Sequence, residues 1–253
     1  MWDAALYNKL GKERLQPSVD LAGRLAGRDF GRILDVGCGT GLSTLALKAQ
    51  WPNAEITGVD LSAEMLEKAT QTIESVTWLQ RDCAKPLDDL GTYDLVFSNA
   101  FLQWLSDQEG FLKNARNVLG KKGVLAIQLP DFKSMKASDC IHKIAATYGG
   151  AFRCIENELF SNKDIEDYYD ILKRYYISVE VWRTSYYHVM ANHEAILEFI
   201  KGTALRPYIK RLDDGEAGVF LQKILSELKD CYPIQEDGNV LFEFKRMFFL
   251  AEN

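Results

Sequence analysis

Residues 35–41 read Asp-Val-Gly-Cys-Gly-Thr-Gly and follow the apolar pair Ile33-Leu34. Glycine lets a chain turn tightly and lets a ligand approach the backbone with no Cβ in the way. The dinucleotide-binding pattern places a third glycine where this chain has Leu42. The carboxylate of Asp35 would disfavour a pyrophosphate and suit an ammonium or a sulfonium. The stretch therefore indicates a cationic ligand at Gly37, Gly39 and Gly41, although a simple strand–helix turn would use the same glycines.

Polar residues recur at later positions where a strand is expected to end. Asp60 stands 19 residues after Gly41 and can accept hydrogen bonds from ribose hydroxyls, with Leu61 and Met65 beside it. Ligands of open parallel sheets bind beyond the carboxyl ends of the strands, so these residues are expected at one edge. The remaining candidate cofactor-binding residues are Asp82, Cys83, Asn99 and Ala100.

The elements that must position these residues alternate along the first half of the chain. Short apolar runs rich in β-branched residues predict strands, and the segments between them have helical patterns. Strand alternating with helix predicts βαβ units and a parallel sheet covered on both faces. The expected strands are 33–36, 55–59, 76–79, 95–98 and 124–129, and the expected helices are 42–50, 63–72 and 107–119.

The pattern changes after Leu129. Residues 134–148 and 163–175 are expected to be helical, and 178–189 and 240–251 to be longer strands. The fold class expected is α/β, a Rossmann-like seven-stranded sheet with helices on both faces and a helical lid inserted between the last two strands. The expected domains are an N-terminal helical cap (1–30), a core (31–189 and 240–253) and the lid insertion (190–239).

The amino-acid composition limits the classes of partner that the protein is expected to bind. Lys and Arg number 30 and Asp and Glu number 36 in 253 residues, a net charge of −6 that argues against broad nucleic-acid binding. No apolar run reaches the roughly 18 residues of a membrane helix, and no signal peptide is recognisable. Five scattered cysteines, none in a C-x-x-C pair, favour reduced thiols in the cytoplasm. We expect no metal, no nucleic-acid or membrane partner, and a monomer.

These motifs together resemble the class I S-adenosylmethionine-dependent methyltransferases. In that family a D-x-G-x-G-x-G loop wraps the methionine part of the cofactor, an acid after the second strand holds the ribose, and an acid after the third lies near the adenine. Leu119-Gly120 and Gly123-Val124 match the family's fifth-strand signature. The resemblance implies S-adenosylmethionine as cofactor and S-adenosylhomocysteine as product.

The methyl acceptor is suggested by the later segments. The stretch 199–212 holds Lys201, Arg206, Lys210 and Arg211 and no acid, which favours an anionic substrate, although these cations also suit a solvated helix face. In the strand expected at 178–189, Tyr186 and His188 share a face with Thr184, and Arg183 and Tyr187 share the other. Because one face alone can meet a ligand, part of this set is expected to be wrong.

A closer resemblance covers residues 2–250. Several motifs along the chain look like those of the trans-aconitate methyltransferase family. They are Trp2-Asp3, Tyr7, Glu13-Arg14, the stretch N-A-x-L-Q-W-L with Gln103 and Trp104, V-W-R-T-x-Y-Y-H and L-R-P-Y. It implies transfer of a methyl group to a carboxylate, with no proton-transfer residue. The expected substrate-binding residues are Tyr7, Arg14, Gln103, Trp104, Arg183, Tyr186, Tyr187, His188 and Arg206.

One alternative keeps the fold, the cofactor and the ester chemistry. A malonyl-acyl carrier protein O-methyltransferase of biotin synthesis would use Lys201, Lys210 and Arg211 as a docking patch for an acidic carrier protein. A cofactor-binding module without catalysis is a second alternative, but the sequence shows no degraded motif that would support a loss of activity. The segment 133–161 resembles little in the family, so a different preferred acid is expected if that segment lines the pocket.

Overall fold

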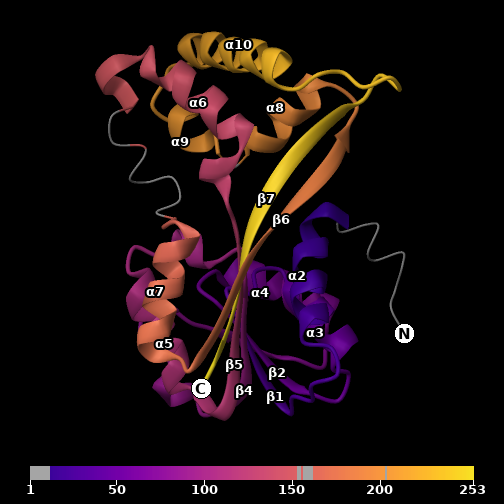
Figure 1. Ribbon diagram of the computed structural model, residues 1–253, viewed down its shortest axis with the longest axis vertical. Coiled ribbons are helices and arrows are strands. Elements are labelled where there is room, and N and C mark those ends of the chain that lie inside the picture. Colours follow the sequence, from indigo (N-terminus) through magenta and orange to yellow (C-terminus); the bar gives the residue numbers. More distant parts are fainter. Residues whose placement is uncertain (1–11, 153–154, 156–161, 203) are drawn as a thin grey trace. The chain divides into compact units, whose positions relative to one another are not determined.

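The computed structural model describes residues 12–152, 155, 162–202 and 204–253 (Figure 1). The proposed contact from Tyr7 lies outside these residues. The helices are α2 (Lys12–Arg24), α3 (Leu42–Gln50), α4 (Ala63–Thr72), α5 (Gln108–Asn117), α6 (Lys136–Ala146), α7 (Ile165–Tyr175), α8 (His193–Lys201), α9 (Arg206–Ile209) and α10 (Asp214–Cys231). Short 3₁₀ turns are η1 (Asp88–Leu90), η2 (Leu102–Trp104), η3 (Phe132–Ser134) and η4 (Gly149–Phe152).

The strands form one seven-stranded sheet in the order β3-β2-β1-β4-β5-β7-β6. Its members are β1 (Arg32–Val36), β2 (Glu55–Asp60), β3 (Thr77–Gln80), β4 (Tyr93–Asn99), β5 (Leu119–Pro130), β6 (Ser178–Met190) and β7 (Val240–Glu252). The first five pair in parallel, with Asp35 opposite Gly58 on one side and Phe97 on the other. The seven-stranded α/β fold predicted from the sequence is confirmed.

Two compact units make up the chain. The first comprises residues 1–129, 163–183 and 247–253, and its core gathers apolar side chains from β1, β4, β5, α5 and α7. In this unit α5 and α7 lie on one side of the strands and α2 and α3 on the other (Figure 1). Both faces of the parallel sheet are thus covered, which explains why β1 and β4 are almost continuously buried.

The second unit comprises residues 130–162 and 184–246. It contains the expected helical insertion between β6 and β7, here α8, α9 and α10, but it also takes α6, which the sequence assigned to the core. The reason is packing: Cys140, Ile141 and Ile144 of α6 join Phe220 and Ile224 of α10 in one apolar cluster. Within it the ring of Tyr208 stacks on that of Phe220, and the ring of Phe152 contacts both of them edge to face.

Local signals set most helix ends. Gly41 precedes α3 at φ 84°, and Ser62 caps α4 by accepting a hydrogen bond from the backbone N–H of Met65 at 3.3 Å. The helix expected at 107–119 ends earlier, at Asn117, because Leu119 already pairs with Tyr93 as the first residue of β5. Among the described residues, no helix is long and apolar enough to cross a membrane.

Candidate cofactor and substrate sites

The glycine loop between β1 and α3 requires glycine at each of its three positions. Gly37, Gly39 and Gly41 have φ of 70°, 53° and 84°, in the left-handed region that other residues rarely adopt. A Cβ on Gly37 would lie 2.3 Å from the ring of Phe101, and one on Gly41 would lie 3.1 Å from Trp78. A Cβ on Gly39 would meet no atom within 4 Å. Gly39 is therefore the glycine whose backbone a ligand can approach.

Asp60 ends β2 and anchors this loop. Its Oδ2 accepts a hydrogen bond from the backbone N–H of Gly39 at 2.9 Å, and its Oδ1 accepts one from that of Ser62 at 2.9 Å. A carboxylate has about four lone-pair sites, so it retains capacity for ribose hydroxyls. The carboxylate thus connects the glycine loop to the start of α4.

Asp35 is fully buried at the end of β1. Its Oδ2 accepts hydrogen bonds from the hydroxyls of Ser43 at 2.7 Å and Thr44 at 2.6 Å, both in the first turn of α3. Burial raises the pKa of Asp35 to about 6, while the two hydroxyls oppose that rise and Asp60 adds to it. The sequence predicted a ligand role for this carboxylate and missed its bonds to α3.

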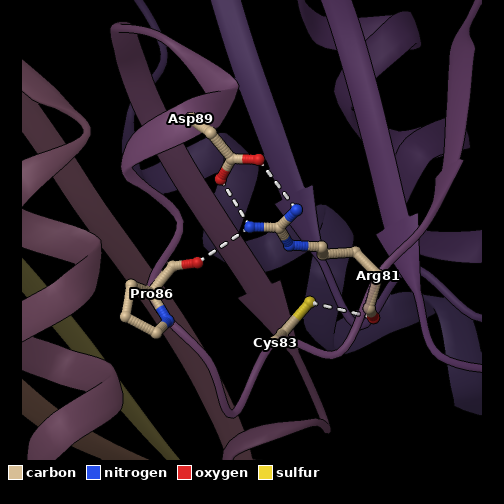
Figure 2. A network of polar contacts seen from close by, with 4 residues as sticks. All are labelled: Arg81, Cys83, Pro86 and Asp89. Carbon is tan, nitrogen blue, oxygen red and sulfur yellow. Dashed lines mark hydrogen bonds and ion pairs between the residues drawn. The ribbon is translucent and has the colours of Figure 1, made fainter.

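The loop after β3 carries Asp82 and Cys83. Asp82 accepts a hydrogen bond from the backbone N–H of Ala84 at 3.1 Å, and Cys83 is buried with its thiol directed to the carbonyl of Arg81 at 3.7 Å. Figure 2 shows what orders the loop: the Arg81 guanidinium bonds both carboxylate oxygens of Asp89 and the carbonyl of Pro86. The sequence did not identify Arg81 as a loop-ordering residue.

The loop that leaves β4 is strained. Ala100 has a φ of 55°, and its N–H donates to the carbonyl of Gln128 at 2.8 Å. Gln103 is buried in η2 and donates its amide to the Ala100 carbonyl at 2.7 Å. Next to it, 63% of the Trp104 surface is exposed.

Five shielded side-chain oxygen atoms of this unit have no hydrogen-bond partner among the described residues, and three of them, Asp35 Oδ1, Asn99 Oδ1 and Gln103 Oε1, lie at or just after the ends of β1 and β4. Such acceptors are usually paired, so their presence at the ends of β1 and β4 suits a ligand that brings N–H donors. Beside Asp60, Leu61 and Met65 are unusually exposed for apolar residues, at 66% and 38%. They offer apolar surface to a flat ring.

The predicted alternation along β6 is confirmed. His188 is buried and Tyr186 half-buried, whereas Arg183 and Tyr187 are exposed. The Tyr187 hydroxyl donates to Glu243 at 3.3 Å. His188 lies among the rings of Phe199, Phe242 and Phe244, with centroids 5.7–6.3 Å away.

The remaining candidates are divided between the two units. Arg14 lies on α2 with an exposed surface, and Gln103, Trp104 and Arg183 also belong to the first unit. Tyr186, Tyr187, His188 and Arg206 belong to the second, where Arg206 is exposed at the start of α9.

One charged residue escaped the sequence analysis. Arg246 of β7 lies in the second unit, with its guanidinium carbon 4.4 Å from the centroid of Phe244. Burial lowers the pKa of Arg246 to about 10, and the neighbouring Tyr186 opposes that shift. The sequence carried one indication of this position: in the stretch F-E-F-K-R-M-F (242–248), the two-residue period of a strand places Arg246 on the same face as Phe242, Phe244 and Phe248.

Comparison with known proteins identifies the family. A methyltransferase domain model matches residues 34–127. A trans-aconitate 2-methyltransferase from Enterobacter sp. strain 638 is 37% identical over 250 residues, 99% of this chain and 97% of that protein.

The crystal structure of YcgJ from Bacillus subtilis covers 94% of this chain and 98% of its own, with a TM-score of 0.63 at 16% identity. Haemonchus contortus phosphoethanolamine N-methyltransferase 2, solved with S-adenosyl-L-methionine, covers 93% of this chain and 52% of its own at a TM-score of 0.56 and 18% identity. This chain has the same fold as these two structures. Its similarity to the Enterobacter protein shows that it belongs to the trans-aconitate 2-methyltransferase family and is an S-adenosylmethionine-dependent methyltransferase.

Proposed function

We propose that the protein transfers a methyl group from S-adenosylmethionine to a carboxylate of trans-aconitate, or of a related small polycarboxylate, and forms the monomethyl ester. The observation that carries this proposal is the near full-length similarity to a trans-aconitate 2-methyltransferase. The cations of the segment 199–212 support it, because a polycarboxylate carries several negative charges.

The glycine loop suits the proposed cofactor. The open space at Gly39 admits a close backbone contact, and Asp60 offers acceptors for ribose hydroxyls. The unpaired oxygens of Asp35, Asn99 and Gln103 suit an ammonium group, and the exposed Leu61 and Met65 suit the adenine ring. The other proposed cofactor-binding residues are Asp82 and Cys83 after β3 and Ala100 after β4. When bound, S-adenosylmethionine supplies an electrophilic methyl group on a sulfonium.

The chain's own residues have a limited chemical task. A carboxylic acid with a pKa near 4 is already ionised at pH 7, so no general base is needed. The protein must orient one carboxylate oxygen in line with the methyl group and neutralise the other carboxylates. Orientation of this kind can contribute about 7–11 kcal/mol. The proposed binding residues are Tyr7, Arg14, Gln103, Trp104, Arg183, Tyr186, Tyr187, His188 and Arg206.

The test is methyl transfer from labelled S-adenosylmethionine to trans-aconitate, cis-aconitate, citrate, isopropylmalate and malonyl-acyl carrier protein. Base-labile label on trans-aconitate, with little on the carrier protein, is the expected result. Label on the carrier protein alone would replace the small-acid proposal with a protein substrate. Lys201 forms an ion pair with Glu198 at 3.1 Å, so part of the basic patch proposed for carrier-protein docking is already neutralised.

A further inference from the structure

Arg246 has the same strand parity in β7 as Phe242 and Phe244, and its guanidinium carbon lies 4.4 Å from the centroid of the Phe244 ring. On the neighbouring strand β6, His188 contacts both of these phenylalanines, and Tyr186 lies close enough to Arg246 to influence its charge. One arginine is thus grouped with a phenol, an imidazole and two phenyl rings, all within the second unit.

The Arg246 side chain is half-buried, and among the described residues no carboxylate pairs with its guanidinium. Its Nε is shielded from solvent and has no hydrogen-bond partner within the part of the chain that the structure describes. In that same part, no Asp or Glu forms an ion pair with it, whereas the adjacent Lys245 bonds the Ser134 carbonyl at 2.9 Å and lies 3.8 Å from Glu243. Stacking on Phe244 offsets part of the cost, but buried charges are normally paired.

We propose that Arg246 is a substrate-binding residue that receives one carboxylate of the acid substrate. The inference rests on the proposed function and deepens it by naming the cation that the sequence analysis lacked. Arg246 presents a planar fork of N–H donors that matches a carboxylate. Tyr186 adds a phenol on the same side, and the Phe244 ring covers one side of the guanidinium, which lowers the local dielectric constant and strengthens a charge-assisted hydrogen bond.

The same geometry decides between the two faces of β6. The face with Tyr186 and His188 holds a desolvated cation, whereas the face with Tyr187 directs its hydroxyl to the Glu243 carboxylate. An anionic substrate is attracted to Arg246 on the first face, whereas on the second face the Glu243 carboxylate contacts Tyr187 and opposes an anion at that residue, although Lys245 lies 3.8 Å from Glu243. Tyr186 and Arg246 therefore belong to the substrate-binding set, and Arg246 neutralises a carboxylate that does not react.

The experiment compares Arg246→Gln and Arg246→Lys with the wild type, and uses Lys229→Gln as a matched loss of one positive charge. Lys229 pairs with Glu194 at 3.0 Å on the exposed part of the same unit. For Arg246→Gln the KM for trans-aconitate should rise roughly 10- to 150-fold, because a hydrogen-bonded charge is lost. Arg246→Lys should recover part of the loss, since it restores the charge without the fork. The Kd of the cofactor should stay within about twofold, as should every value for Lys229→Gln.

The outcomes separate this inference from the proposed function. If the wild type methylates trans-aconitate and Arg246→Gln has the same KM as Lys229→Gln, the inference is wrong and the function stands. If the wild type methylates no acid of the panel, the function is rejected, and calorimetric titration of trans-aconitate into the wild type and Arg246→Gln decides the inference. Equal binding by both proteins, or no binding by either, overturns it. Should Arg246→Gln fail to fold by circular dichroism, Arg246→Lys carries the test.

Discussion

Asp60 accepts a hydrogen bond from the backbone N–H of Gly39 at 2.9 Å, so the carboxylate that ends β2 fixes the glycine loop that follows β1. The two residues are 21 positions apart in sequence, and the parallel pairing of β1 with β2 brings their strand ends together. The residue proposed to bind the ribose therefore also shapes the loop proposed to bind the methionine moiety.

Asp60→Ala should weaken cofactor binding strongly, because it removes the loop anchor and the ribose acceptors at once. Each lost charged hydrogen bond corresponds to about 1.5–3 kcal/mol, so the Kd of S-adenosylmethionine should rise at least roughly tenfold. Calorimetry measures this directly. Glu64→Ala, which removes an exposed carboxylate from the adjacent helix, is the control and should leave the Kd unchanged. Equal affinities for the two variants would contradict the assignment of Asp60.

Alanine at Gly37 and at Gly39 should have different consequences. At Gly37 the new Cβ collides with Phe101 in addition to the backbone strain, so the free energy of unfolding should fall by about 2–5 kcal/mol. At Gly39 there is strain without a collision, so the loss should be about 1–2 kcal/mol. Urea denaturation measures both values.

Cofactor affinity should be lowered more by Gly39→Ala than its small effect on the free energy of unfolding would suggest. A Cβ on Gly39 enters the space in which we propose that the ligand approaches, so Gly39→Ala should raise the Kd of S-adenosylmethionine although it remains folded. Cofactor affinity at the wild-type level in Gly39→Ala would show that this space is not used.

Asp35 should give the protein a measurable pH dependence of stability. Its pKa rises from 3.8 to about 6 on folding, so the protonated carboxyl stabilises the fold fully below pH 3.8, and this contribution is lost as the pH rises through about 6. The difference amounts to about 3 kcal/mol. The unfolding free energy of the wild type, minus that of Asp35→Asn, should therefore decrease between pH 4 and pH 6.5.

Two variants check the assignment of this effect to Asp35. The Ser43 and Thr44 hydroxyls hold the pKa of Asp35 down, so Ser43→Ala and Thr44→Ala should move the transition to higher pH. A difference between wild type and Asp35→Asn that stays flat with pH would rule out the buried carboxyl as its source.

Cys140 of α6 and Cys231 of α10 should form a disulfide under mild oxidation, for example with diamide. Their sulfur atoms are 3.1 Å apart, and both residues belong to the second unit. Burial raises the pKa of Cys140 to about 12, so the reaction should be slow at neutral pH and faster at higher pH, because the thiolate is the nucleophile. Peptide mapping by mass spectrometry detects the product.

Cys140→Ser is the matched control for the crosslink, and it should abolish the linked peptide without changing the labelling of Cys38 or Cys83. A predominant disulfide between any other pair of cysteines would contradict the packing of α6 on α10.

The sequence by itself determined the features that depend on local signals. Helices α3 and α4 have the expected bounds because Gly41, the Trp51-Pro52 stop and the Ser62 cap act within a turn of the backbone. The alternation of β6 followed from the two-residue period of a strand, and the order of glycines and acids was sufficient to identify the cofactor class. The α/β sheet followed from the same periodicities.

The tertiary structure decided what depends on residues far apart in the chain. Desolvation raises the pKa of Asp35, and only the burial of β1 between its neighbours produces it. The assignment of α6 to the second unit depends on its contacts with α10, more than 70 residues later. The sequence gives Arg246 the strand parity of Phe242 and Phe244, but it does not show that the guanidinium is shielded from solvent, because an arginine in a strand is usually solvated. Arg246 becomes a candidate binding residue only where β6 and β7 surround it with rings and leave its charge without a carboxylate partner among the described residues.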